Sequence, residues 1–151
     1  MSPQNIILAM LAVAAGMLFP IQTAANALLA KSVGGTIAAT LFSITSSWFL
    51  LVLLDVVAFR QMPSMSDLAA TPFYLMVLGG ILGAIFLSFN VMLAPRLGAA
   101  ATLCFAIAGQ LMAALMIDRL GLFNFAVREL SFGRVVGVVL VFAGAVLVRL
   151  T

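Results

Sequence analysis

Five long apolar runs, separated by short polar breaks, dominate this sequence. Each run is continuous and close to the roughly 20 residues that a helix needs to cross the hydrocarbon core of a bilayer. A transmembrane barrel would instead alternate apolar and polar positions. The pattern therefore predicts an all-α integral membrane protein in one domain covering residues 1–151. Its predicted transmembrane helices are residues 4–30, 36–59, 73–94, 99–117 and 132–150.

The breaks between the runs contain residues that form turns or end helices. Val33-Gly34-Gly35 predicts a tight turn, and Pro95-Arg96-Leu97-Gly98 predicts the end of the third helix. Residues 61–71 are polar and are expected to form a loop. Residues 120–131 mix aromatic, apolar and charged positions, which is typical of a short helix lying in the membrane interface.

Composition supports the membrane class and excludes several functions. The chain is 66% hydrophobic and 7% charged, whereas soluble domains are about 45–50% apolar and about 25% charged. The basic residues are scattered singly, so there is no basic patch for nucleic acid. Cys104 is the only cysteine and there is no histidine, which removes the usual zinc and iron ligand sets and any internal disulfide. We therefore expect no metal, no cofactor and no enzymatic activity.

An odd number of spans places the two termini on opposite sides of the membrane. The basic residues divide almost evenly, so the positive-inside rule gives little preference. The N-terminal side has Arg60, Arg119, Arg128 and Arg134, and the other side has Lys31, Arg96 and Arg149. Either the N-terminus is weakly favoured inside, or the chain inserts in both orientations. In the second case two copies form an inverted pair, and many transporters bind substrate between inverted repeats.

The first run contains a helix breaker and two carboxamides. Pro20 removes one backbone hydrogen bond, so it predicts a kink that can serve as a hinge. Gln22 and Asn26 lie four residues apart and share one helix face. Polar side chains at this depth normally face protein or a water-filled cavity rather than lipid. This stretch is therefore predicted to line a path for a small molecule.

Three further residues inside the apolar runs extend this predicted site. Trp48 and Gln110 lie near the midplane, and Asn90 lies in the same half of the bilayer as the two first-helix amides. The predicted substrate-binding residues are Gln22, Asn26, Trp48, Asn90 and Gln110. The alternative is that each polar residue only joins helices by hydrogen bonds, which are common and weak in membranes. The serines around Trp48 are weaker candidates, because membrane serines usually bond their own backbone.

Glycines and acidic residues leave two more alternatives open. Gly133, Gly137 and Gly144 give the last run a small-residue face, which either packs inside one bundle or forms the contact of a dimer. Asp55 and Asp118 are either interfacial anchors or carboxylates that couple transport to protons. The first run contains no acid, which disfavours a proton-coupled exporter with its carboxylate on the first helix.

Several short motifs resemble a known family. They are Pro20-x-Gln22-x-x-x-Asn26, Leu93-Ala94-Pro95-Arg96-Leu97-Gly98-Ala99-Ala100, Gly109-Gln110, Ile117-Asp118-x-x-Gly121 and Arg134-x-x-Gly137. In this order, and nearly end to end, they resemble the YdcZ-type inner-membrane exporters, a branch of the drug/metabolite transporter superfamily. The motifs mark positions without assigning a chemical role to any of them. At the position of Glu129 many relatives are expected to have proline. The resemblance therefore does not extend to the shape of the last loop.

The resemblance implies a bacterial inner-membrane protein similar to one half of a ten-helix inverted-repeat transporter. Together with the residues above, it predicts a secondary transporter that exports a small metabolite or drug-like molecule. We expect an antiparallel homodimer in the lipid bilayer, or a pair with a similar protein, that binds its substrate in a polar midplane cavity. The alternative is a non-transporting membrane subunit or scaffold of a larger complex.

Overall fold

The computed structural model describes residues 3–150, which contain helices and no β-strand. The chain groups into two compact units, one ending at Met92 and the other beginning at Leu93. The long helices are α1 (Pro3–Ser32), α2 (Thr36–Leu54), α4 (Phe73–Leu97), α5 (Ala99–Leu120) and α6 (Phe132–Leu150). A π-helical turn, η1 (Asp55–Phe59), continues α2. The prediction of one domain over residues 1–151 stays a prediction.

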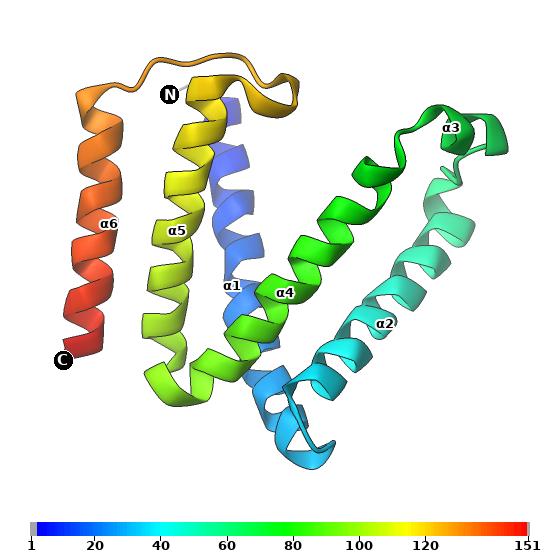
Figure 1. Cartoon of the computed structure of the whole chain (residues 1–151), viewed down its shortest axis with the longest axis horizontal. Helices are drawn as coiled ribbons and strands as arrows, with labels where there is room; N and C mark the ends of the chain where they lie inside the picture. Colours follow the sequence, from blue (N-terminus) through cyan, green and yellow to red (C-terminus); the bar gives the residue numbers. More distant parts are fainter. Residues whose placement is uncertain (1–2, 151) are drawn as a thin grey trace. The chain divides into compact units, whose positions relative to one another are not determined.

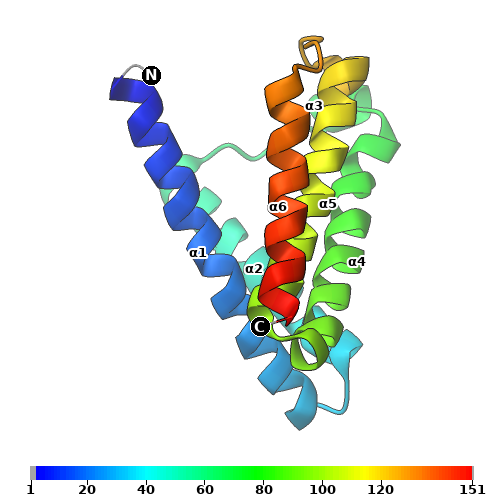
Figure 2. The same ribbon diagram turned by 90° about the vertical axis from the view of Figure 1, so that its left-hand side faces the viewer.

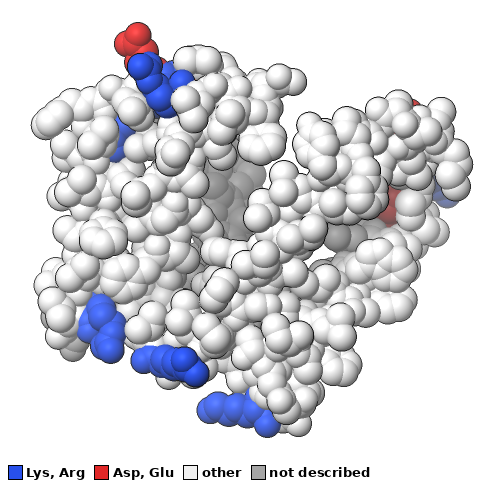
Figure 3. Space-filling model, in the orientation of Figure 1, with Lys and Arg blue, Asp and Glu red and all other residues white. Residues whose placement is uncertain are grey.

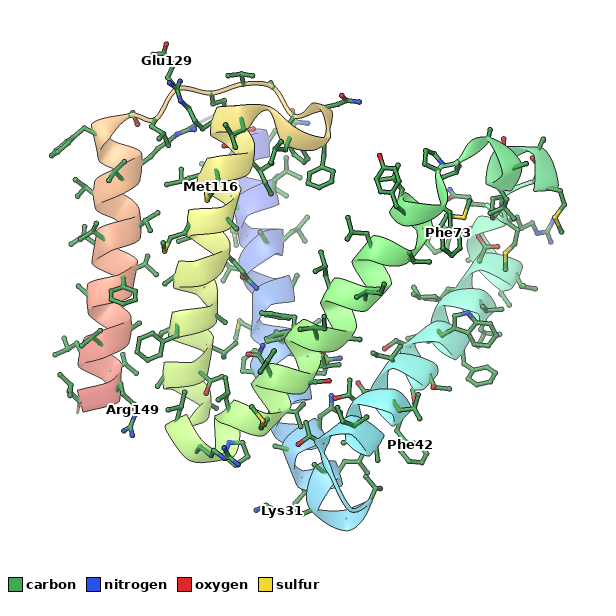
Figure 4. The ribbon with its side chains drawn as sticks, in the orientation of Figure 1. Lys31, Phe42, Phe73, Met116, Glu129 and Arg149 are labelled. Atoms are coloured by element: carbon green, nitrogen blue, oxygen red, sulfur yellow. The ribbon has the colours of Figure 1, made fainter. Side chains whose placement is uncertain are left out.

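The predicted membrane class and the predicted helices are confirmed. Within the described residues, five helices are long and apolar enough to cross a membrane. Charged side chains lie near helix ends on the face shown in Figure 3, and uncharged atoms cover the lengths between them. Figure 4 shows the same for Lys31 and Arg149, at the ends of α1 and α6. Helices suit this setting because they satisfy their backbone hydrogen bonds internally.

Two predicted helix ends were too early. α4 passes through Pro95 and ends at Leu97, because proline lacks only one backbone N–H and the chain leaves the helix at Gly98, where φ is 88°. α5 continues to Leu120 and ends at Gly121, which adopts the left-handed conformation with φ of 62°. In both cases a glycine, rather than the preceding proline or charged residue, ends the helix.

The first polar segment contains a helix that we had not predicted. α3 (Met65–Ala70) begins with a capping box: the Asp67 backbone N–H donates to Ser64 Oγ at 3.2 Å, and the Ser64 N–H donates to Asp67 Oδ2 at 3.1 Å. Each bond satisfies a backbone donor that the first turn would otherwise leave free. The Ser-x-x-Asp spacing was the available signal in the sequence.

The interfacial helix predicted over residues 120–131 is wrong. Only one short turn forms there, η2 (Leu122–Asn124), and residues 125–131 are not helical. Phe123 and Asn124 have φ of 55° and 62°, outside the right-handed helical region. The segment folds back on α5 instead, where the Arg128 N–H donates to the Asp118 carbonyl at 2.9 Å.

The first unit is built from α1, α2 and most of α4. α1 and α2 pack together after a tight turn at Gly34, where φ is 85° (Figures 1 and 2). The Phe19 and Phe86 rings join α1 to α4 at 5.4 Å between centroids. α2 is linked to α4 by Ser88 Oγ, which donates to Thr40 Oγ1 at 3.3 Å. A few small contacts, rather than a large core, hold these helices.

The second unit is built mainly from α5 and α6, which lie side by side and antiparallel in both ribbon views (Figures 1 and 2). Phe105 meets Phe142 edge to face at 6.1 Å. Arg134 Nη1 lies 3.5 Å from Asp118 Oδ2. An aromatic pair and an ion pair therefore connect the two helices at different heights.

We predict that Ser64→Ala raises the pKa of Asp67. The Ser64 hydroxyl, and then its backbone N–H, donate to this carboxylate and lower the pKa below the ordinary value of 3.8. A lowered folded pKa stabilises α3 above the unfolded pKa, and this stabilisation is lost as pH falls through the folded value. A carboxyl carbon NMR titration measures the shift. An unchanged Asp67 pKa in the variant would contradict the assignment.

We predict that Gly121→Ala destabilises the protein. A Cβ at Gly121 would lie 2.7 Å from Val127 Cγ2, on a backbone with φ of 62°. Left-handed backbone costs a non-glycine residue about 1–2 kcal/mol. The control is Gly79→Ala, because a Cβ there meets nothing within 4 Å. Thermal unfolding in mild detergent should show a lower midpoint for Gly121→Ala alone, and equal midpoints would refute the role of this turn.

Candidate substrate site

Three polar residues in the second half of α1, Gln22, Thr23 and Asn26, face protein rather than lipid. Thr23 is 2% exposed and Asn26 is 6% exposed, although neighbouring residues of α1 are exposed. Gln22 is half-buried, and its Nε2 donates to Ser43 Oγ on α2 at 3.4 Å. Among the described residues, Thr23 Oγ1 and Asn26 Nδ2 have no hydrogen-bond partner. Buried polar groups normally find partners. Helix packing alone therefore does not explain these two unpaired atoms of α1.

A groove of about 350 Å³ lies between α1 and α2, and we call it the α1–α2 groove. Its lining contains amide, hydroxyl and apolar side chains and no charged one. The residues are Asn26, Leu29, Phe42, Ser43, Ser46, Ser47 and Leu50. Phe42 is labelled in Figure 4, where its ring projects from α2.

Three serines of α2 line the groove, although their residue type alone made them weak candidates. Ser43, Ser46 and Ser47 follow the spacing i, i+3, i+4, which places them on one helix face. Ser46 Oγ donates to the Phe42 carbonyl at 2.8 Å, and Ser47 Oγ donates to the Ser43 carbonyl at 2.9 Å. These bonds to their own helix were expected. The spacing was the signal that they share a wall with Asn26.

Trp48 lies away from this groove. Its side chain is 57% exposed, and its ring contacts Phe49 edge to face at 4.9 Å between centroids. It is not among the residues that line the α1–α2 groove. The proposed substrate contact of Trp48 stays a prediction, and within this chain its indole faces outward.

Asn90 and Gln110 differ in their surroundings. Asn90 is 4% exposed, and its Nδ2 donates to the Phe86 carbonyl of its own helix at 2.8 Å. Its Oδ1 has no partner among the described residues. Gln110, on α5, is exposed and belongs to the unit that begins at Leu93. The structure therefore gathers Gln22 and Asn26 on one helix face, and the substrate roles of Asn90 and Gln110 stay predictions.

Both candidate acids lie near helix ends and have local contacts. Asp55 Oδ1 accepts the Gln61 N–H at 2.8 Å, and the Asp55 carbonyl accepts the Arg60 N–H at 2.6 Å. Asp118 faces Arg134, and about a third of each side chain is exposed. These contacts fit a structural role for both acids: Asp55 caps a helix end, and Asp118 forms an ion pair. A coupling role for either acid stays a prediction.

The three glycines of α6 are open. A Cβ built on Gly133, Gly137 or Gly144 meets nothing within 4 Å. Gly137 lines a groove of about 400 Å³ between α5 and α6, together with Asp118 and Arg134. Within the unit that begins at Leu93, none of the three glycines lies against a neighbouring helix, and the choice between bundle packing and a dimer contact stays a prediction. α1 runs through Pro20 as one helix, and the hinge role of Pro20 stays a prediction.

The comparisons with known proteins address the family rather than the site. No curated protein and no solved structure matches this chain at a significant level. One family model does, and its description is "Putative inner membrane exporter, YdcZ". The match covers residues 7–147, which include all five candidate spans almost completely. The chain therefore belongs to the YdcZ family that this model describes, as its motifs and its five apolar helices predicted.

Proposed function

We propose that this protein is a secondary transporter that exports a small neutral or amphipathic molecule across the inner membrane. The observation that carries the proposal is the buried polar face of α1, where Asn26 is 6% exposed and its Nδ2 has no partner among the described residues. Polar groups inside a span normally mark a substrate path or pair with one another. Leaving a buried amide N–H unpaired costs free energy, so helix packing alone does not explain Asn26.

We propose further that the working form is an antiparallel pair of chains. Five spans place the termini on opposite sides, and the nearly even division of basic residues permits both orientations. The open glycines of α6 offer a face for a second helix, because small residues let backbones approach closely in lipid. Two inverted copies would then form a ten-helix inverted-repeat transporter with its site near the midplane.

In this arrangement the substrate lies against α1. Gln22 and Asn26 supply hydrogen bonds, and Asn90, Gln110 and Trp48 contribute from other helices or from the second chain. Rocking of one chain against the other exposes the site to each side in turn, with Pro20 as a hinge. Asp55 and Asp118 are the acids available for proton coupling, and neither lies on α1.

We predict that Gly144→Leu breaks the pair of chains. A leucine side chain on the open glycine face blocks the close approach of a second helix. Ala143→Leu is the matched control, since Ala143 is also exposed but lies about 100° around the helix. Crosslinking in membranes should fall for Gly144→Leu only.

Topology reporters on both termini test the orientation directly. Signal on both sides of the membrane from each reporter supports the inverted pair. A single fixed orientation contradicts the homodimer and leaves only a pair with a similar protein. A stoichiometric larger partner, with no stabilisation by any small molecule, would favour the scaffold alternative instead.

We predict that replacing Gln22 and Asn26 by alanine abolishes transport while the protein remains folded. The substrate loses its hydrogen bonds, whereas membrane hydrogen bonds between helices contribute only about 0.6 kcal/mol on average to stability. The measurement is transport into proteoliposomes of a compound found by ligand-dependent thermal stabilisation. Transport that survives the double replacement would show that both amides only join helices. Circular dichroism and crosslinking check the fold.

A further inference from the structure

We infer that the α1–α2 groove selects a neutral molecule that both donates and accepts hydrogen bonds, such as an alcohol, a diol or a primary amide on a short apolar body. This inference rests on the proposed function and names the substrate class of that site. It follows from the donors, acceptors and charges that line the groove.

The wall of the groove contains a buried donor without a partner, the side-chain amide of Asn26. Asn26 is more than nine-tenths buried, and its Nδ2 has no partner among the described residues. A buried donor without an acceptor is costly to leave unpaired. A carbonyl, hydroxyl or amide oxygen of a bound molecule would satisfy it.

The groove also offers acceptors. Ser46 donates its hydroxyl hydrogen to the Phe42 carbonyl, and Ser47 donates its hydrogen to the Ser43 carbonyl. A hydroxyl has one hydrogen and two lone pairs, so both serine oxygens remain free to accept. A ligand with an O–H or N–H group matches these oxygens. One polar group that donates and accepts therefore suits Asn26 and the serines together.

Among the residues that the structure describes, no charged side chain lines the groove. An ammonium ion would need a carboxylate beside it, and a carboxylate would need a cation, because an unpaired charge is strongly disfavoured in a membrane interior. Asp55, the first residue of η1, lies eight residues beyond Ser47, which is about 12 Å along the span. The lining thus disfavours cations and anions alike.

The remaining walls are apolar. Leu29, Phe42 and Leu50 complete the lining, and the volume of about 350 Å³ is near the lower end of the range for small-molecule sites. A short alkyl or aromatic body fits these walls. The site therefore matches a small amphipathic molecule rather than a sugar or a peptide.

Cysteine labelling tests whether the groove is a wet, ligand-binding space. The full chain carries Cys104→Ala, since Cys104 is the only native cysteine, and is placed in lipid nanodiscs. Ser46→Cys puts a thiol in the groove, and Thr45→Cys is the matched control, exposed but outside the lining. Because only the thiolate reacts and it forms only in contact with water, N-ethylmaleimide should label Ser46→Cys at least about tenfold faster.

Protection from labelling then identifies the ligand class. The probes share one chain length and differ in their polar group: 1,2-hexanediol and hexanamide are neutral, hexylammonium is cationic and hexanoate is anionic. We expect the neutral pair to slow labelling of Ser46→Cys and the charged pair to have no effect. The labelling rate of Thr45→Cys with each probe corrects for changes in the bilayer itself.

A second variant tests whether the Asn26 side-chain amide donates to the ligand. Asn26→Leu keeps a similar volume and removes the donor, so about tenfold more hexanamide should be needed for half protection, as expected for one hydrogen bond. If this variant does not fold, Ser47→Ala, which removes an acceptor, decides the question by the same measurement.

Two results would overturn the inference: a Ser46→Cys thiol as unreactive as the control, or equal or better protection by the charged probes. Failure of the proposed function looks different. Absence of transport by the unaltered chain in proteoliposomes, for every compound that protects Ser46→Cys, would refute that function and leave the protection pattern unchanged.

Discussion

Every backbone N–H and C=O group inside a lipid bilayer needs a partner from the protein itself, and the structure depends on this constraint. The described spans meet it with unbroken helices, and the irregular backbone is placed at their ends. Gly34, Arg60, Gly98 and Gly121, all with positive φ, lie between helices rather than within them. Near the end of α2 the Asp55 side chain accepts a backbone N–H that the turn would leave unpaired.

The second constraint is that lipid gives helices no hydrophobic reason to associate. The buried residues are accordingly few and mostly small, among them Ala39, Ala101, Ala108 and Ala145. Specific pairs join the helices instead: Ser88 with Thr40, Phe105 with Phe142 and Arg134 with Asp118. Such sparse packing leaves open glycines and lateral grooves, which are the features on which the proposed pair of chains depends.

The unpaired amide of Asn26 links this architecture to function. A membrane helix keeps a polar residue only where something satisfies it, and no described residue satisfies Asn26 Nδ2. Ser46 and Ser47 beside it donate their hydroxyl hydrogens to backbone carbonyls of their own helix, so their oxygens can still accept. The uncharged lining, with an unpaired donor and several acceptors, is the basis of the proposal that the groove takes a neutral ligand.

The sequence alone determined the membrane class, the approximate spans and the family, because run length and an apolar composition are enough to specify a transmembrane helix. It also identified Gln22 and Asn26, since amides are rare in such runs. Tertiary structure decided which residues share a wall. Depth in the membrane follows from position along a helix, but the direction of a side chain depends on how that helix packs against its neighbours. For this reason Ser46 and Ser47 join Asn26 in the groove, and Trp48 faces outward.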